Sequence, residues 1–262
     1  MNNTCTALSI ENGIARLRLT DPETGNPIHR RFCDELCDRA IEMSCHSDVR
    51  AVLVTAEGSN FGFGGDIAHF VAQGDALPAE IKRMTATIHS AIARLQRMDA
   101  PMVVAVQGIC AGGSAAFAAG CDVVVSADTA RWVAAYTGIG YSTDASATVM
   151  FSRRMGLARA SNFLLRNQTL DANAALAAGL VDEVVPADEL LAHAEAIAAK
   201  FAVGPTKAYG EVRRLLLTAQ NQPLEAQLEL EAQALARVAA TDDAREGLRS
   251  FSEKRKPSFT GR

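Results

Sequence analysis

The sequence predicts an α/β fold followed by a purely helical C-terminal region, and three observations support this prediction. Apolar runs of strand length alternate with patterns of helical period up to about residue 187. Two glycine-rich turns, residues 60–67 and 108–115, each join an apolar run to a helical pattern. From residue 188 onward, every segment has apolar residues at helical spacing with charged residues between them.

The first elements are expected to be a hairpin, a helix and a buried strand. The runs TALSI and IARLRLT alternate apolar and polar residues around the tripeptide ENG, which predicts a β-hairpin. The stretch GNPIHRRFCDELCDRAIEM follows as an amphipathic helix with Ile28, Phe32, Leu36 and Ala40 on one face. RAVLVTAEG is a buried strand, and GSNFGFGGDIAHF is a glycine-rich loop that leads into a short helix.

The middle of the chain continues the alternation of helices and strands. LPAEIKRMTATIHSAIARLQRM is a long helix with five apolar residues at helical spacing: Ile81, Met84, Ile88, Ile92 and Leu95. APMVVAVQG is a strand that leads through the second glycine turn into an alanine-rich helix, and DVVVSA is another strand. ASATVMFSRRM is a further helix.

The last strand and the C-terminal helices complete the expected order. DANAALAAG is a short helix with Asp171 as N-cap and Gly179 just after its end. LVDEVVP is the final strand. The helices that follow are expected at 188–202, 206–220, 223–240 and 242–255.

Composition and charge argue against several classes of protein. The chain has 262 residues, 48% of them hydrophobic, and a net charge of −4, so it has no overall basic field for nucleic acid or anionic membrane. No apolar run approaches the roughly 20 residues of a bilayer span. The N-terminus has no basic segment followed by an apolar core, as a secretory signal would. We therefore expect a cytoplasmic protein without a nucleic-acid or membrane partner.

The six cysteines do not predict a metal site. They form no CxxC pair, and cytosolic cysteines are mostly reduced. Cys33 and Cys37 lie four residues apart on a predicted helix, near Cys45 and His46, so a metal site is conceivable. The simpler interpretation is that these cysteines pack one face of the helix, and we expect no metal.

A strand, a glycine turn and a helix present backbone N–H groups to a phosphate, to a thioester oxygen or to nothing at all. The turn GICAGGSA lacks the G-x-G-x-x-G spacing of a dinucleotide site, and no P-loop lysine follows its glycines. The acid that would hold a ribose is also missing after the next strand. Nucleotide binding at this turn is therefore not expected.

The pair of turns, NFGFGGDI and GICAGGSA, resembles the crotonase superfamily, also called the enoyl-CoA hydratase/isomerase family. Further stretches resemble that family in the same order: DPETGNPI, TLDANAALAAGLVDEVVP and FSEKRKPSFTG. The resemblance covers nearly the whole chain. It implies a spiral of repeated ββα units over residues 1–200 and a helical trimerisation region over 201–262. The assembly it implies is a homotrimer or a dimer of trimers.

The resemblance also implies a site for an acyl-CoA thioester. The N–H groups of Gly65 and Gly113 would bind the thioester oxygen as an oxyanion hole. Phe63, Asp66 and Ile67 surround the first of these turns and would contact the substrate. Other substrate contacts are implied for the aromatic residues Trp132 and Tyr136, and for the cations that would bind CoA phosphates: Arg30, Arg31 and Lys254. Coenzyme A would be part of the substrate, and no separate cofactor is expected.

The chain departs from the hydratases of the family at both of their glutamates. Those positions fall on Ala116 and Tyr136 here, so hydration by two carboxylates is not expected. Asp144, eight residues after Tyr136, resembles the aspartate of certain isomerases and of the 4-chlorobenzoyl-CoA dehalogenases. His89, 24 residues before Gly113, resembles the histidine that activates water in those dehalogenases.

Three functions remain open on the sequence. The leading one is an enoyl-CoA isomerase with Asp144 as base. The second is a hydrolytic aryl-CoA dehalogenase with Asp144 as nucleophile and His89 as base, and the third is a non-catalytic CoA-thioester-binding protein. Structural roles are also open: Asp144 can cap the helix that follows it, and His89 can be a packed helix residue. The distinguishing observation is whether the Asp144 carboxylate points at the space beside Gly65 and Gly113.

Overall fold

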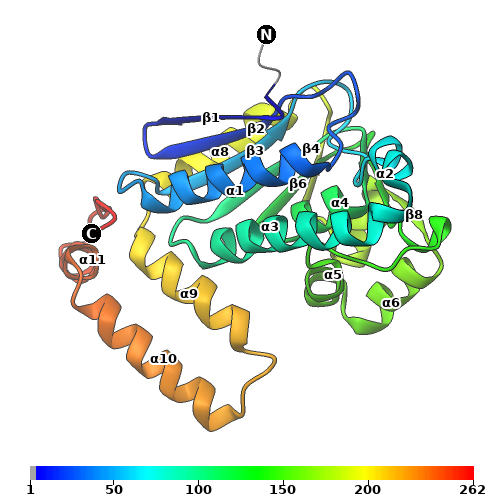
Figure 1. Cartoon of the computed structure of the whole chain (residues 1–262). Helices are drawn as coiled ribbons and strands as arrows, with labels where there is room; N and C mark the ends of the chain where they lie inside the picture. The colour runs from blue at the N-terminus through cyan, green and yellow to red at the C-terminus, as the bar shows by residue number, and fades with distance from the viewer. Residues whose placement is uncertain (1–3) are drawn as a thin grey trace.

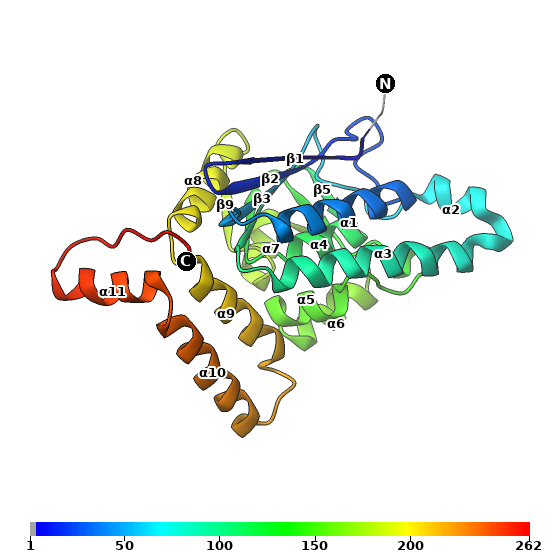
Figure 2. The same cartoon turned by 60° about the vertical axis from the view of Figure 1, so that its left-hand side comes forward.

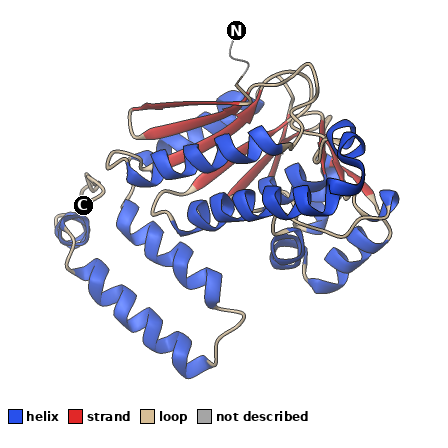
Figure 3. Cartoon of the chain, in the orientation of Figure 1, coloured by secondary structure: helices blue, strands red, loops and turns tan. Residues whose placement is uncertain are grey.

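A computed structural model describes residues 4–262 and has a six-stranded sheet as its centre (Figures 1 and 3). The order across the sheet is β1 (Thr6–Glu11), β2 (Ile14–Leu19), β3 (Ala51–Ala56), β4 (Met102–Val106), β6 (Val123–Ala127) and β9 (Glu183–Val185). Only β1 and β2 run antiparallel, and every other neighbouring pair is parallel. The predicted hairpin is confirmed: Asn12 and Gly13 both have positive φ, as a two-residue hairpin turn requires.

Helices cover both faces of this sheet, which explains why β4 is apolar throughout and why β3 and β6 have one polar residue each, Thr55 and Ser126. Helices α1 (Arg30–Cys45) and α3 (Leu77–Arg97) lie together on one face, and α8 (Leu190–Ala202) packs on the other (Figure 1). Strand side chains alternate accordingly. Val52 and Val54 join the core beneath α1 and α3, whereas Ala51 and Leu53 join the core beneath α8.

A second, three-stranded sheet in the order β5-β7-β8 lies beside the first. Its strands are β5 (Ile109–Ala111), β7 (Arg131–Val133) and β8 (Thr169–Asp171). The sequence did not predict them, because three residues are too few to show an alternating pattern. The helices that follow these strands or pack beside them are α4 (Gly112–Ala119), α5 (Ala147–Met155), α6 (Leu157–Leu165) and α7 (Ala172–Ala178).

The caps predicted for α7 are confirmed. The Asp171 side chain accepts a hydrogen bond from the Ala174 N–H at 2.8 Å, and Gly179 ends the helix in the left-handed conformation. Three further short segments lie outside the core: the helix α2 (Ile67–Gln73) and single 3₁₀ turns at Gly74–Ala76 and Thr137–Ile139. Within residues 4–262, no helix combines the length and the apolar character that crossing a membrane requires.

The remaining helices, α9 (Thr206–Thr218), α10 (Leu224–Ala239) and α11 (Asp242–Ser252), confirm the helical C-terminal region. Helix α9 is fixed to the core by the buried Arg213, whose guanidinium pairs with Asp122 at 2.9 Å and also binds the Leu95 carbonyl. Helix α10 packs on α9 and α11 and extends away from the sheet (Figures 1 and 2). It leaves Leu224, Leu228 and Leu235 exposed to solvent.

Candidate active site

The two glycine-rich turns are joined by backbone hydrogen bonds. The Gly62 N–H donates to the Ile109 carbonyl at 3.1 Å, and the Ala111 N–H donates back to the Gly62 carbonyl at 2.9 Å. The Gly64 N–H donates to the Ser114 hydroxyl at 3.2 Å. A side chain at Gly64, where φ is +81°, would lie 2.8 Å from the Ala111 carbonyl oxygen, so this close approach requires glycine. These contacts therefore fix the positions of Gly65 and Gly113 relative to each other.

The N–H groups of Gly65 and Gly113 are left available by this arrangement. The backbone of Ile28 forms hydrogen bonds with the two residues that flank Gly65. The Ile28 N–H donates to the Gly64 carbonyl at 2.7 Å, and the Ile28 carbonyl accepts from the Asp66 N–H at 3.0 Å. Gly113 is the second residue of α4, where N–H groups have no partner within a helix. Among residues 4–262, neither N–H has a hydrogen-bond acceptor. Both groups can thus donate to a bound molecule.

Gly65 and Gly113 line the same cavity, which has a volume of about 580 Å³. Tyr136, Asp144 and His89 line it as well. Its remaining walls are mainly apolar and include Ile28, Phe63, Ile67, Phe70, Ile81, Met84 and Ile88. An apolar space with two backbone donors and one carboxylate suits an acyl thioester better than it suits a free phosphate or nucleotide.

The Asp144 carboxylate lies beside Gly113. A Cβ atom built on Gly113 would lie 3.6 Å from Asp144 Oδ1. Asp144 does not cap α5, because the residue at that cap is Ser146 and no capping hydrogen bond to an Asp144 side-chain oxygen is present in the described chain. Instead, Oδ1 accepts a hydrogen bond from the Tyr136 hydroxyl at 3.0 Å. The carboxylate is therefore directed into the cavity rather than toward the helix that follows it.

Tyr136, at the position of a missing hydratase glutamate, is a hydrogen-bond donor to this acid. Its side chain is buried, and burial together with the negative charge of Asp144 raises the pKa of the Tyr136 phenol above its ordinary value. The phenol stays protonated, so it donates to the carboxylate and cannot act as a base near neutral pH. Tyr136 lines the cavity, where a substrate contact was predicted for it. Its hydroxyl also has a hydrogen-bond partner within the chain, the Asp144 carboxylate.

His89 contacts the backbone directly after the acid. Its Nε2 lies 3.1 Å from the Ala145 nitrogen. Because a backbone N–H can only donate, Nε2 must accept, and the proton of the neutral ring is then on Nδ1. In this arrangement Nε2 has no free lone pair with which to take a proton from water.

The chain around the acid has an unusual backbone. Ala135, Ala145 and Ser146 have φ values of +54°, +48° and +68°, in the left-handed region that residues other than glycine rarely adopt. Each such residue costs roughly 1–2 kcal/mol relative to a right-handed conformation. These residues adjoin Tyr136 and Asp144, so the strained positions coincide with the polar end of the cavity.

Two of the residues predicted to contact substrate have structural roles in this chain. Trp132 is fully buried, and its indole N–H donates to the Ser126 hydroxyl at 3.2 Å, so it lies in the core and not on the cavity. Asp66 caps α2 by accepting from the His69 N–H at 2.9 Å. Phe63 and Ile67, by contrast, are exposed and line the cavity, as expected for substrate contacts.

The cations predicted to bind CoA phosphates lie in two different places. Arg30 and Arg31 begin α1, two and three residues after Ile28, and they pair with Asp34 at 3.0 Å and with Glu35 at 3.7 Å, respectively. Lys254 follows α11, which lies on the opposite side of the molecule from α2, the helix whose residues Ile67 and Phe70 line the cavity (Figure 2). One chain therefore does not bring Lys254 to the cavity, and its predicted contact requires a neighbouring subunit.

One group of potential metal ligands occurs in the described part of the chain: Cys5, Asp21 and His29, whose ligand atoms lie within 4.8 Å of one another. The contacts of these residues oppose a metal. His29 Nδ1 accepts from the Phe32 N–H at 3.3 Å, which leaves the ring proton on Nε2, the nitrogen that faces Cys5. The Arg31 guanidinium donates to the Cys5 sulfur at 3.2 Å, so a positive charge is already present there. We assign no metal to this group.

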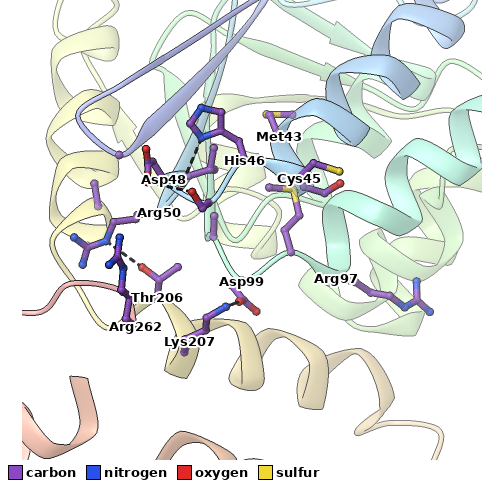
Figure 4. Close-up of a pocket in the computed structure, with 18 of the residues that line it drawn as sticks. Met43, Cys45, His46, Asp48, Arg50, Arg97, Asp99, Thr206, Lys207 and Arg262 are labelled. Carbon is purple, nitrogen blue, oxygen red and sulfur yellow. Dashed lines mark hydrogen bonds and ion pairs between the residues drawn. The ribbon is translucent and has the colours of Figure 1, made fainter. Parts of the chain in front are cut away.

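A larger cavity of about 870 Å³ lies where α1 and α3 end, close to the C-terminus (Figure 4). Neither glycine turn nor Asp144 lines it. Its polar side chains bind other parts of the chain. Arg50 donates to the Gly204 and Phe259 carbonyls at 2.8 and 3.0 Å, and Lys207 pairs with Asp99 at 2.8 Å. These contacts connect the C-terminal segment to the core, and the smaller cavity remains the candidate active site.

Several cavity residues were not singled out as functional from the sequence. Phe70 and Tyr141 stack with ring centroids 6.2 Å apart and form part of the wall. Cys33 also lines the cavity, and burial raises the pKa of its thiol to about 12, so it contributes an apolar surface rather than a nucleophile. The helical spacing of Ile81, Met84 and Ile88 predicted a buried face, but only the fold shows that this face borders a cavity.

Comparison with known proteins gives a consistent result over almost the entire chain. The family model described as enoyl-CoA hydratase/isomerase matches residues 9–262. The "Probable enoyl-CoA hydratase" of Rhodobacter capsulatus is 34% identical over 253 residues, covering 97% of this chain and 96% of that protein. The trans-2-decenoyl-acyl-carrier-protein isomerase of Streptococcus mutans is 27% identical over 256 residues, covering 97% of each.

A solved structure agrees with these relatives. The crystal structure described as an enoyl-CoA hydratase/isomerase from Mycobacterium abscessus shares 33% identity and a TM-score of 0.92. The match covers 98% of this chain and 100% of that one. The resemblance on which the expected fold was based is therefore confirmed.

Proposed function

The chain belongs to the enoyl-CoA hydratase/isomerase family, and we propose that within this family it is an enoyl-CoA isomerase that uses Asp144 as its base. The observation that supports this proposal most directly is the position of the carboxylate. It lies beside Gly113, in an apolar cavity that Gly65 also lines.

Gly65 and Gly113 would stabilise the enolate. Their N–H groups have no acceptor among the described residues, so both can donate to the thioester carbonyl oxygen as it gains negative charge. One such donor contributes roughly 3 to 4 kcal/mol to a transition state in which an oxyanion forms. The hydrogen bonds between the two turns keep this geometry in place before substrate binds.

Asp144 would move the proton. In a 3-enoyl thioester, the carboxylate takes a proton from C2, and the electrons of that C–H bond delocalise onto the carbonyl oxygen to give a dienolate. The carboxylic acid so formed then delivers the proton to C4, and the double bond shifts to C2–C3. The acid is restored to its carboxylate, so the reaction needs no cofactor apart from the coenzyme A in the substrate.

The groups around Asp144 support isomerisation over hydration. A hydratase needs one group to deprotonate water and another to deliver a proton. Position 116 is a fully buried alanine, and Tyr136 is a protonated donor to Asp144. One carboxylate remains on the cavity, which suits a reaction that removes and returns a single proton.

The hydrolytic alternative is less well supported because of His89. An aryl-CoA dehalogenase would need His89 to take a proton from the water that attacks the ester at Asp144. Here Nε2 accepts from the Ala145 N–H, so the ring is not poised for that role. A non-catalytic binding protein would leave the carboxylate beside Gly113 and the strained backbone around it without a purpose.

The test is the conversion of a 3-enoyl-CoA to the conjugated 2-enoyl-CoA, followed by ultraviolet absorbance. Asp144→Asn keeps the shape of the side chain and removes the base, so we expect turnover to fall roughly a hundredfold or more. Reaction in D₂O should place deuterium at C4, at least in part. An active enzyme whose Asp144→Asn variant keeps full turnover would refute the proposal, as would halide release from a halogenated aryl-CoA that depends on both Asp144 and His89.

A further inference from the structure

The loop that presents Asp144 is not held by favourable backbone conformations. Ala145 and Ser146, the two residues after the acid, are both left-handed, and neither is glycine. Such a turn persists only where surrounding contacts outweigh its strain. The contacts that hold the turn therefore decide where the carboxylate points.

We propose that His89 is a positioning residue that fixes this turn from helix α3 and so directs the Asp144 carboxylate toward Gly113. The inference rests on the proposed role of Asp144 as base. His89 Nε2 accepts the Ala145 N–H at 3.1 Å, at the first strained residue after the acid. Without this acceptor, the N–H would have to find another partner, and the turn could relax.

The acid is thus held at two points from two elements. The Tyr136 hydroxyl, in the loop after β7, donates to Oδ1 at 3.0 Å and fixes the carboxylate itself. His89 fixes the backbone one residue later, from a long helix whose neighbouring residue Ile88 is buried in the core. A rigid helix positions a catalytic group more precisely than a loop does, because residues of the helix move little relative to the sheet.

This role differs from the base assigned to His89 in the hydrolytic alternative. A base needs a free lone pair directed at water, and in this structure the Nε2 lone pair is directed at Ala145. The proposal also makes a specific statement about the ring: when neutral, it carries its proton on Nδ1. Free histidine in water favours the opposite tautomer, with the proton on Nε2, so the two states can be told apart.

The kinetic test uses a pair of substitutions at one position. His89→Gln retains an acceptor oxygen near the place of Nε2, whereas His89→Leu has none. We expect His89→Leu to lower kcat roughly tenfold to a hundredfold with little change in KM, because a small displacement of a reacting group has effects of this size. His89→Gln should remain within about threefold of the parent. Ala86→Leu, on an exposed site one turn earlier in α3, is the matched control and should change neither constant.

The outcomes separate this inference from the proposed function. If Asp144→Asn removes turnover and His89→Leu retains it, the positioning role is wrong and the function stands. Equal losses in His89→Gln and His89→Leu would also contradict positioning, since they would point to the imidazole itself. If Asp144→Asn retains full turnover, the proposed function fails, and the tautomer decides whether His89 holds the turn.

That tautomer can be read without substrate. The chain has five histidines, so selective ¹⁵N labelling gives few signals, and the one that disappears in His89→Gln belongs to His89. Long-range ¹⁵N–¹H correlation should then show Nδ1 protonated and Nε2 bare at a pH where the ring is neutral. A proton on Nε2 would overturn the proposal.

Discussion

The region around the cavity and the C-terminal helices α9–α11 differ in how far their apolar side chains are buried within one chain. Around the cavity, strands such as β4 are buried on both faces by helices of the same chain. Along α10 and α11, large apolar side chains face solvent, and Leu235 and Phe251 are 71% and 86% exposed. The difference indicates that one chain is sufficient to place the proposed reacting groups, whereas the tail leaves an apolar surface exposed, which we propose that other subunits cover. Changes in the two regions should therefore affect different measurements.

The largest effect on chemistry is expected from Gly113→Pro. Proline removes one of the two N–H donors, and we expect turnover to fall roughly a hundredfold or more. Gly113→Ala is the matched variant, because it keeps the N–H, and its added methyl group meets the end of the Ile28 side chain at 2.9 Å. It should lose much less.

Circular dichroism must show that Gly113→Pro is folded. A folded proline variant with full activity would mean that Gly113 does not bind the thioester oxygen.

A smaller kinetic effect is expected from Tyr136→Phe. The carboxylate loses the hydroxyl that orients Oδ1, and we expect kcat to fall about tenfold, the scale of one hydrogen bond to a charged group. Steady-state kinetics on a 3-enoyl-CoA measures this directly. Unchanged kcat would show that Asp144 is oriented without Tyr136.

Tyr136→Phe should also reduce the loss of folding stability that the parent shows in strong alkali. Burial raises the pKa of Tyr136 in the folded chain, so above pH 10 the unfolded chain loses a proton that the folded chain keeps. Stability then falls by about 1.4 kcal/mol for each pH unit from this one group. Tyr136→Phe should remove that contribution, so urea unfolding at pH 10 to 11 should show a shallower loss than in the parent. An equal slope in both proteins would mean that the phenol also ionises in the folded state.

The contrast between the regions is tested most directly at α10. We propose that residues 201–262 form a trimerisation region, so the parent chain should have three or six times the 27.8 kDa mass of one subunit by light scattering. Leu228→Glu combined with Leu235→Glu places charge on the exposed apolar face and should yield folded monomers. A parent chain that is a stable monomer at micromolar concentration would contradict the proposal.

The smallest effect is expected from Lys254→Ala. An exposed cation that binds a CoA phosphate contributes up to about 1 kcal/mol, so KM should rise about threefold to fivefold with kcat unchanged. Because Lys254 lies far from the cavity of its own chain, this effect should disappear in the α10 double variant. If Lys254→Ala raises KM equally in monomers, the lysine acts within its own subunit and the tail is placed differently in solution.

The parts of the fold that could be predicted from sequence are those specified locally. The ENG hairpin and the caps of α7 follow from turn and capping chemistry within a few residues. Strands β5, β7 and β8 could not be predicted, because their three-residue segments exist only through pairing with one another. Trp132, whose aromatic ring suggested a substrate contact, is instead buried in the core.

The candidate site shows the same division. Gly65 and Gly113 were found from motifs, since glycine turns are visible in the sequence. The orientation of Asp144 was not predictable, because it depends on a left-handed turn of ordinary residues and on contacts with Tyr136 and His89 from distant segments. No local pattern specifies that geometry.

The left-handed residues that follow Asp144 identify a position where a substitution could raise the stability of the fold. Glycine adopts a φ near +48° without the steric cost that Ala145 incurs, so Ala145→Gly would relieve roughly 1 kcal/mol of strain, less the entropy that glycine loses on folding. It would keep the N–H that His89 accepts, yet it would also loosen the peptide next to the acid. The methyl group of Ala145 thus represents a trade-off between thermal stability and a fixed orientation of the Asp144 carboxylate.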